Sequence, residues 1–117
     1  MTSDPGPWLE QVLSSLAAQD YPNVSVVVVD SASATDPTPL VDSVLPGAFV
    51  WRLEKRVGFG RAANQVRQLV QGASHYLLCH DDVILAPDAV RLLLEEAFRS
   101  NSAITSPKYL QWDSPDR

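Results

Sequence analysis

The sequence has few cysteines, few glycines and few basic side chains among its 117 residues. Its one cysteine, Cys79, excludes an internal disulfide and fits a reducing compartment. Nine Lys and Arg residues against fourteen Asp and Glu residues give a formal net charge of −5. This balance argues against a general nucleic-acid surface, because phosphate binding requires clustered basic side chains. No apolar run reaches the length of a membrane span, and no cationic leader precedes an apolar stretch, so we expect a soluble domain.

The apolar and charged contents, 45% and 20%, are ordinary for a soluble globular protein. The length suits one domain, residues 1–117, with a real hydrophobic core, although it is small for a complete enzyme. Large aromatic side chains are scattered along the chain, and we predict that they are core or half-buried residues rather than a platform for stacking sugars. They are Trp8, Phe49, Trp51, Phe98 and Trp112.

Helical and strand patterns alternate along the sequence. Apolar residues at helical spacing predict helices over residues 8–17, 39–45, 61–71 and 88–100, with Ser3 or Asp4 capping the first and Gly72 ending the third. Short apolar runs predict strands over residues 24–29 and 76–79, and alternation predicts a strand nearer the sheet edge over residues 49–54. A last short strand is expected over residues 103–106. The run 24–29 is apolar on both faces and is expected to be a central strand. The alternation predicts an α/β fold with a parallel, Rossmann-like sheet and helices on both faces.

Two adjacent carboxylates follow the apolar run Tyr76–Cys79, with His80 between. His80, Asp81 and Asp82 stand at the expected carboxyl end of a strand, where open α/β sheets bind ligands. Neighbouring carboxylates repel each other and lose solvation in a fold, so they need hydrogen bonds or a cation such as Mg²⁺ or Mn²⁺. The alternative is a solvated loop whose acids favour the N-terminus of the next helix.

Other acidic residues are expected at the same edge of the sheet. Asp4 and Asp30 stand, like Asp81 and Asp82, at strand ends or loop starts. Because parallel strands end at one edge, these residues predict a polar rim able to hold a base, a ribose and a metal-bound diphosphate.

The order of four segments resembles the nucleotide-sugar-binding half of an inverting glycosyltransferase of family 2, which has the GT-A fold. The first segment resembles the family's first helix and its closing turn. The second resembles the strand and Asp-rich loop that hold the nucleoside. The third is glycine-rich and ends in Asn, and the fourth resembles the DxD element with its trailing Pro-Asp. These segments are residues 13–22, 26–36, 58–64 and 80–88.

The resemblance implies roles for particular residues. Asp30 would accept hydrogen bonds from the nucleobase or ribose. Asp82, and His80 in the place of the first acid, would bind Mn²⁺ or Mg²⁺, while Asp81 would act through water or a ribose hydroxyl. A metal on the diphosphate stabilises the leaving nucleoside diphosphate without a proton transfer. The other residues implied in donor binding are Thr2, Asp4, Ser31, Gly58, Gly60, Arg61 and Asn64.

The resemblance also implies partners and a location. The donor would be a UDP- or dTDP-sugar, and the acceptor a glycan or a lipid-linked molecule. Family members of this kind often build cell-envelope polysaccharides, so we expect a cytoplasmic location, or the cytoplasmic face of the membrane for a longer protein.

The sequence departs from the family's pattern at both ends. Only Thr2–Asp4 represents the end of the family's first strand, which lies between those corresponding to 24–29 and 76–79. A gap there would leave unpaired strand edges, so we expect the two strands to pair directly, a strand to precede Met1, or a second copy to supply the contact. The family's catalytic base and acceptor-binding half lie downstream, so this chain is expected to bind the donor but to be inactive alone.

Two other functions fit parts of the sequence. Gly58 to Ala63 matches G-x-G-x-x-A, the fingerprint of an NAD-binding Rossmann domain, although the glycines do not directly follow the first strand. A non-catalytic domain that binds a nucleotide or a partner is the second alternative. Arg52, Lys55 and Arg56 are predicted to be a solvated loop cluster rather than a diphosphate clamp, and Arg61 is the better candidate for contacting the nucleotide.

Overall fold

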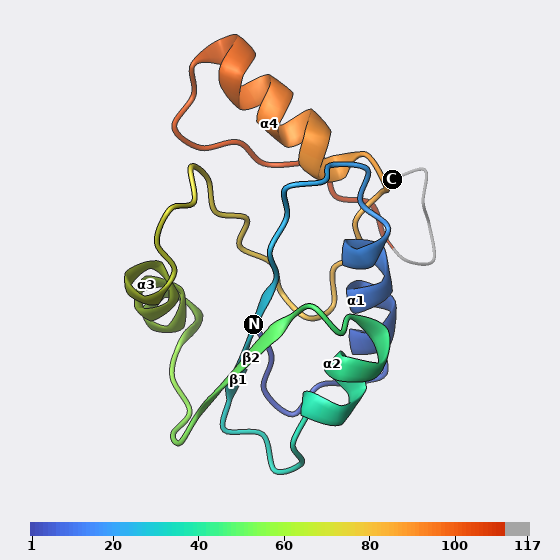
Figure 1. Cartoon of the computed structure of the whole chain (residues 1–117), viewed down its shortest axis with the longest axis vertical. Helices are drawn as coiled ribbons and strands as arrows, with labels where there is room; N and C mark the ends of the chain where they lie inside the picture. The colour runs from blue at the N-terminus through green and yellow to red at the C-terminus, as the bar shows by residue number, and fades with distance from the viewer. Residues whose placement is uncertain (112–117) are drawn as a thin grey trace.

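Helices and strands alternate in the computed structural model, which describes residues 1–111 (Figure 1). The elements of the described residues are α1 (Leu9–Ala17), β1 (Val27–Ser31), α2 (Thr38–Val44), β2 (Phe49–Leu53), α3 (Phe59–Leu69) and α4 (Ala89–Ser100). The helices begin within about two residues of their predicted positions. The caps differ, because α1 follows Trp8 without a side-chain cap among the described residues and α3 ends at Leu69 with Val70 as its C-cap, before Gly72.

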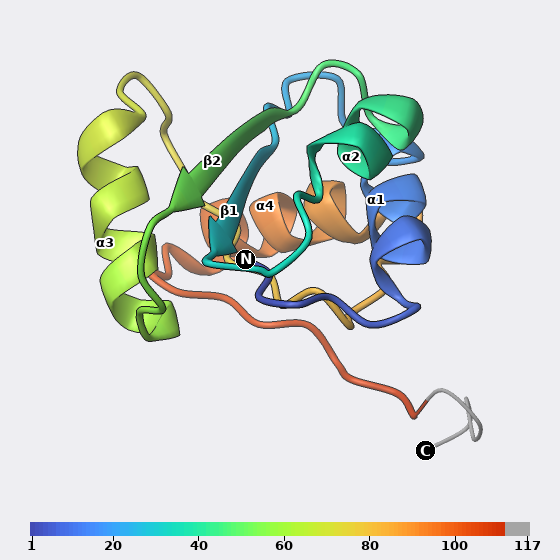
Figure 2. The ribbon, with the colours of Figure 1, turned by 90° about the horizontal axis from the view of Figure 1, so that it is seen from below.

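A small parallel sheet forms the centre of the fold. β1 and β2 pair in parallel from Val27 opposite Phe49 to Ser31 opposite Leu53, and α2 connects them. Helices α1 and α2 lie on one side of this sheet and α3 lies on the other (Figures 1 and 2). The predicted α/β class with helices on both faces is confirmed.

The start of the chain lies along the free edge of β1. The Thr2 N–H donates to the Val29 carbonyl at 2.8 Å, and the Ser31 N–H donates to the Thr2 carbonyl at 2.8 Å, which makes a parallel bridge between Thr2 and Asp30. On the other side, the Met1 amino group donates to the Cys79 carbonyl at 3.0 Å. Residues 1–3 therefore lie between β1 and Cys79, where the family's first strand is expected, and the two neighbours do not pair directly.

Two predicted strands are wrong. Residues 76–79 and 103–106 lie within the described part of the chain, and neither has strand geometry. A strand needs a ladder of backbone hydrogen bonds to a neighbouring strand. Among the described residues, segment 76–79 has one hydrogen bond to the chain start, from the Met1 amino group to the Cys79 carbonyl. The apolar run 76–79 predicted a buried strand, yet Leu78 is 59% exposed, and in the other segment Ile104 is 87% exposed.

The hydrophobic core lies between α1, α2 and the sheet. Its fully packed members come from α1, β1 and α2, and they are Leu9, Leu13, Val28 and Val41. Apolar residues at the ends of these elements and on β2 cover the core, namely Val26, Val44, Leu45, Ala48 and Val50. Burial of apolar surface stabilises a fold by about 25 cal/mol per Å², so this cluster is the main source of stability.

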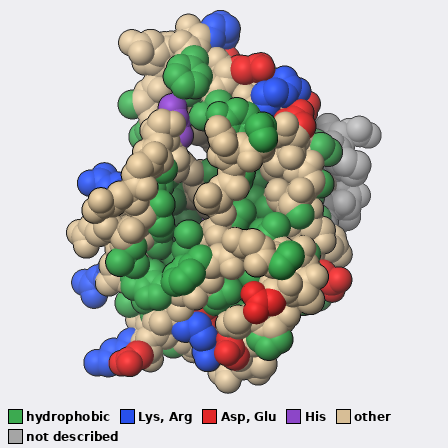
Figure 3. Space-filling model, in the orientation of Figure 1, with side chains coloured by type: hydrophobic (Ala, Val, Ile, Leu, Met, Phe, Trp, Pro, Cys, Tyr) green, Lys and Arg blue, Asp and Glu red, His purple; other side chains and the backbone are tan. Residues whose placement is uncertain are grey.

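Most of the large aromatic residues are more exposed than predicted. Trp51 is half-buried, as expected, but Trp8, Phe49 and Phe98 are exposed, and Phe98 has 72% of its surface accessible. Trp112 lies outside the described residues. Figure 3 shows hydrophobic side chains open on one face of the molecule. None of the helices within residues 1–111 has both the length and the hydropathy that crossing a bilayer requires.

Candidate functional site

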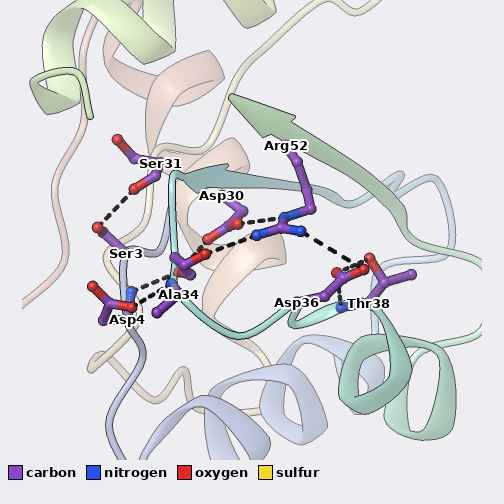
Figure 4. A network of polar contacts seen from close by, with 9 residues as sticks. Ser3, Asp4, Asp30, Ser31, Ala34, Asp36, Thr38 and Arg52 are labelled. Atoms are coloured by element: carbon purple, nitrogen blue, oxygen red, sulfur yellow. Dashed lines mark hydrogen bonds and ion pairs between the residues drawn. The ribbon is translucent and has the colours of Figure 1, made fainter. Parts of the chain in front are cut away.

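The Asp30 carboxylate is the buried centre of a polar network at the carboxyl end of β1. Its side chain is fully buried and accepts hydrogen bonds from the Ser33 hydroxyl and, at 2.9 Å, from Arg52 Nε (Figure 4). The parallel register places Arg52 directly opposite Asp30 on β2. A buried carboxylate without such partners would be costly, so this pair stabilises the end of the sheet.

Arg52 connects Asp30 to the loop that follows β1. Its Nη2 donates to the Ser33 carbonyl at 2.8 Å, and its Nη1 lies 3.8 Å from Asp36 Oδ2. The hydrogen bond to Asp30 raises the pKa of the Arg52 guanidinium. The hydroxyl and then the N–H of Thr38 lower the pKa of the Asp36 carboxyl. Arg52 thus keeps its charge next to an open hollow of about 310 Å³ lined by Ala32, Ser33, Arg52, Leu53 and Glu54.

The chain start and the acidic pair meet at the neighbouring part of the same edge. The Thr2 hydroxyl donates to Asp81 Oδ2 at 2.7 Å. Thr2, a buried residue beside β1, therefore orients the Asp81 carboxylate. His80 stacks on Phe59, with ring centroids 4.4 Å apart and an interplanar angle of 28°. A hollow of about 230 Å³ lies here, lined by Met1, Thr2, Ser3, Phe59, His80 and Asp81. Asp82 follows at the exposed turn.

Ser31 joins three segments of the site. Its Oγ accepts the Val57 N–H at 2.9 Å and lies 3.3 Å from the Val57 carbonyl, to which it donates. Its own carbonyl accepts the Ser3 hydroxyl at 2.8 Å. The end of β1, the chain start and the loop before α3 are therefore held together by one buried residue.

Asp4 closes the rim near Asp30 in a left-handed conformation. Its φ is 47°, and Ala32 across the loop has a φ of 54°. The Asp4 N–H donates to Ser33 Oγ at 2.6 Å, Asp4 Oδ1 accepts the Ala34 N–H at 2.8 Å, and Asp4 Oδ2 pairs with Arg56. Such backbone strain persists only where neighbouring bonds hold it, and it is common at functional sites.

The glycine-rich segment reaches the site through Phe59, which lines the hollow beside Asp81. Gly58 precedes α3 and Gly60, Arg61 and Asn64 lie in its first turns, with all four exposed. A Cβ added at Gly58 or Gly60 would meet no described atom within 4 Å, so packing within the described residues does not require glycine at either position. Arg61 and Asn64 make no recorded contact with Asp30 or the acidic pair, and their roles stay predictions.

The acidic pair has the chemistry of a partial divalent-metal site. Asp81 and Asp82 offer carboxylate oxygens, the ligands that Mg²⁺ and Mn²⁺ prefer. Among residues 1–111, no three His, Cys, Asp or Glu side chains gather as a metal-binding group. A Mg²⁺ ion that takes its other ligands from substrate phosphates and water needs only one or two carboxylates, so these residues fit that mode of binding.

These features agree with a match over almost the entire chain. Residues 4–116 match the sequence model of the family described as Glycosyl transferase family 2. The chain belongs to this family. No curated protein matches it. Glycosyltransferases of family 2 take a nucleotide-sugar donor and an acceptor, and divalent metals are common in the family. The NAD fingerprint also fitted the glycine-rich segment, but that fingerprint follows the first strand of its fold, and here the segment follows β2.

The sequence reasoning missed two partners of Asp30, Arg52 and Ser33. Arg52 and Arg56 were expected in a solvated loop, but Arg52 lies in β2 beside Asp30 and Arg56 pairs with Asp4. That prediction was wrong for Arg52, while Arg56 and Lys55 are exposed in the loop after β2 as expected. Ser33 was not singled out either, although it shields Asp30. Pairing strands 24–29 and 49–54 in parallel, and asking what neutralises Asp30, would have found Arg52.

Proposed function

We propose that this glycosyltransferase domain binds the nucleoside diphosphate of a sugar donor along the edge from Asp30 to Asp82, together with a divalent metal. One observation carries the proposal. Thr2 pairs through its backbone with β1 at Asp30 and bonds through its hydroxyl to Asp81. Two predicted subsites, for the nucleoside and for the metal-bound diphosphate, are therefore adjacent.

At the nucleoside end, the open hollow beside Arg52 is the proposed site for the base and ribose. Asp30 is proposed to accept a hydrogen bond there, as the family resemblance implies. An ionised carboxylate has about four acceptor positions. Two of them are used by Ser33 and Arg52. Rotation of the Ser33 hydroxyl would give a ligand access to the carboxylate.

At the diphosphate end, Asp82 and Asp81 are proposed to hold Mn²⁺ or Mg²⁺, with His80 as a further candidate ligand. When bound, the ion neutralises charge that develops on the leaving nucleoside diphosphate. Thr2 orients Asp81 through its hydroxyl, and Phe59 orients the His80 ring by stacking. Gly58, Gly60, Arg61 and Asn64 are proposed to line the diphosphate on the α3 side.

The donor and the acceptor are proposed from the family resemblance. We expect a UDP- or dTDP-sugar as donor, a glycan or lipid-linked acceptor, inversion at the transferred sugar and a site of action on the cytoplasmic side of the membrane. The described residues are proposed to form the donor-binding part of the enzyme, so transfer by this chain alone is not expected.

Calorimetric titration of UDP in the presence of Mn²⁺ tests the proposal, with NAD as the competing ligand. We expect UDP to bind, NAD not to bind, and Asp82→Ala to weaken UDP binding about tenfold or more. Asp42→Ala is the matched control, because Asp42 is exposed on α2, away from the acidic pair. Equal affinity of both variants for UDP, or binding of NAD in preference to UDP, would contradict the assignment.

A further inference from the structure

The segment that follows the acidic pair is held by the C-terminal end of α1 and the turn after it. Residues 83–88 have no regular secondary structure, yet backbone groups of residues 85–87 are bonded to this part of the chain. The Leu85 N–H donates to Ser15 Oγ at 3.2 Å, and the Pro87 carbonyl accepts the Asp20 N–H at 2.9 Å. Leu85, three residues after Asp82, is also buried. The segment therefore depends on tertiary contacts for its position.

Gln19 makes the most extensive of these contacts with one side chain. Its Nε2 donates to the Ala86 carbonyl at 2.8 Å and to the Ser15 carbonyl at 3.0 Å, while its Oε1 accepts the Val90 N–H at 3.0 Å. Val90 lies in the first turn of α4, where N–H groups lack helical partners. Asp88, the residue before α4, makes no side-chain cap among the described residues. Gln19, which lies just after α1, thus serves as the cap of α4 from a segment distant in sequence.

The acidic pair is consequently held from both sides. On the N-terminal side, Met1 bonds to the Cys79 carbonyl and Thr2 bonds to Asp81. On the C-terminal side, Gln19 holds Ala86 and Val90. Asp82 lies between these anchors at a turn, so the position of its backbone depends on both.

We propose that Gln19 is a positioning residue, which sets the placement of the Asp81–Asp82 carboxylates for the metal-bound diphosphate of the donor. This inference rests on the proposed function, because it concerns the metal subsite assigned there. Gln19 acts through the backbone of residues 85–90 and touches neither donor nor metal. Residues that orient metal ligands from outside the coordination sphere typically change metal affinity by about 10- to 100-fold when removed.

The test compares how much Mn²⁺ strengthens UDP binding in Gln19→Ala and in the wild type, with uridine as the ligand that lacks phosphates. We expect Gln19→Ala to reduce the Mn²⁺-dependent gain about tenfold, and to leave uridine affinity unchanged. Gln19→Glu keeps an acceptor for Val90 but loses the donor to Ala86, so it should retain part of the gain. Gln11→Ala is the control, because Gln11 is exposed on α1, the helix that precedes Gln19.

Hydrogen exchange of the same variants reports on the anchor without any ligand. Gln19→Ala should speed exchange of the Leu85 and Val90 amides and leave those of β1 unchanged, which also shows that the fold is intact. Unchanged exchange at Leu85 and Val90, or equal loss of uridine and UDP affinity, would overturn the inference. Absence of any Mn²⁺-dependent gain in the wild type would instead overturn the proposed function.

Discussion

Arg52 shows how one side chain links the sheet to the site. It lies opposite Asp30 in the register of β1 and β2, and its guanidinium also reaches the Ser33 carbonyl. Asp30 is fully buried, so its charge depends on this partner and on Ser33. Arg56 makes the contrasting ion pair, with the exposed Asp4. Buried and exposed pairs differ in what their loss costs, because water compensates only the exposed one.

Replacing Arg52 by Ala is expected to lower the melting temperature by several degrees. The substitution leaves the buried Asp30 carboxylate with Ser33 as its remaining recorded partner, and an unpaired buried charge is strongly destabilising. Thermal unfolding followed by circular dichroism measures the effect. Arg56→Ala is the matched control and should unfold close to the wild type. Equal losses in the two variants would show that Arg52 has no special place at the buried end of β1.

Cys79 reports on the charge of the acidic pair. Burial raises the pKa of the Cys79 thiol; the Met1 ammonium opposes this rise, and the carboxylates of Asp82 and Asp81 add to it. A raised pKa leaves less thiolate near neutral pH, so alkylation by iodoacetamide should be slow there and accelerate only above the free-thiol pKa of about 8.5. Asp82→Asn should move the midpoint of the rate–pH curve to lower pH. A wild-type midpoint at or below the free-thiol value would be inconsistent with this environment.

The helices were predictable from the sequence because each has one apolar face. The spacing of Leu9, Val12 and Leu13 predicts α1, and these residues are buried in the structure. Segment 76–79 was not predictable in the same way. A short apolar run indicates burial on two faces, but the segment becomes a strand only if a neighbour supplies a ladder of backbone partners. The recorded partner of this segment in residues 1–3 is the Met1 amino group.

The packing of α1 against α2 and β1 gives a prediction at this scale. Leu13 is 1% exposed in the core cluster, so Leu13→Ala should lower the free energy of unfolding by about 3 kcal/mol through lost burial and the cavity that remains. Urea denaturation measures this value. Leu40→Ala on α2, at a partly exposed position, should change it by only about 0.5 kcal/mol. A small effect at Leu13 would mean that the core lies elsewhere.

The site was partly predictable. Acids at strand ends indicated that Asp4, Asp30 and Asp81 would lie at one edge, and Thr2 brings Asp30 and Asp81 together there. The partners of these acids were harder to predict from the sequence, because Arg52 and Arg56 are recognised only once the strand register and the loop path are known. The hydrogen bonds that join Gln19 to residues 86 and 90 cross about 70 positions of sequence. No local pattern encodes such a contact.

At the scale of the whole molecule, the net charge of the chain and the charge of the proposed ligand have the same sign, so they repel each other. The chain has a formal charge of −5, and the diphosphate of a sugar donor is also negative. The two carboxylates at 81–82 increase this repulsion unless a cation lies between them and the phosphates. A divalent ion thus makes the acidic edge compatible with an anionic donor. The account therefore depends on the acidic pair binding the ion together with the diphosphate.

The electron paramagnetic resonance signal of Mn²⁺ tests this claim most directly, because free hexaaquo Mn²⁺ gives a sharp six-line spectrum that weakens on binding. The chain and UDP together should weaken the signal more than either does alone, and Asp82→Ala should weaken ternary binding about tenfold or more. Asp42→Ala should behave as the wild type. The account would be contradicted if the chain and UDP together weakened the signal no more than either alone. It would also be contradicted if Asp82→Ala and the wild type weakened the signal equally.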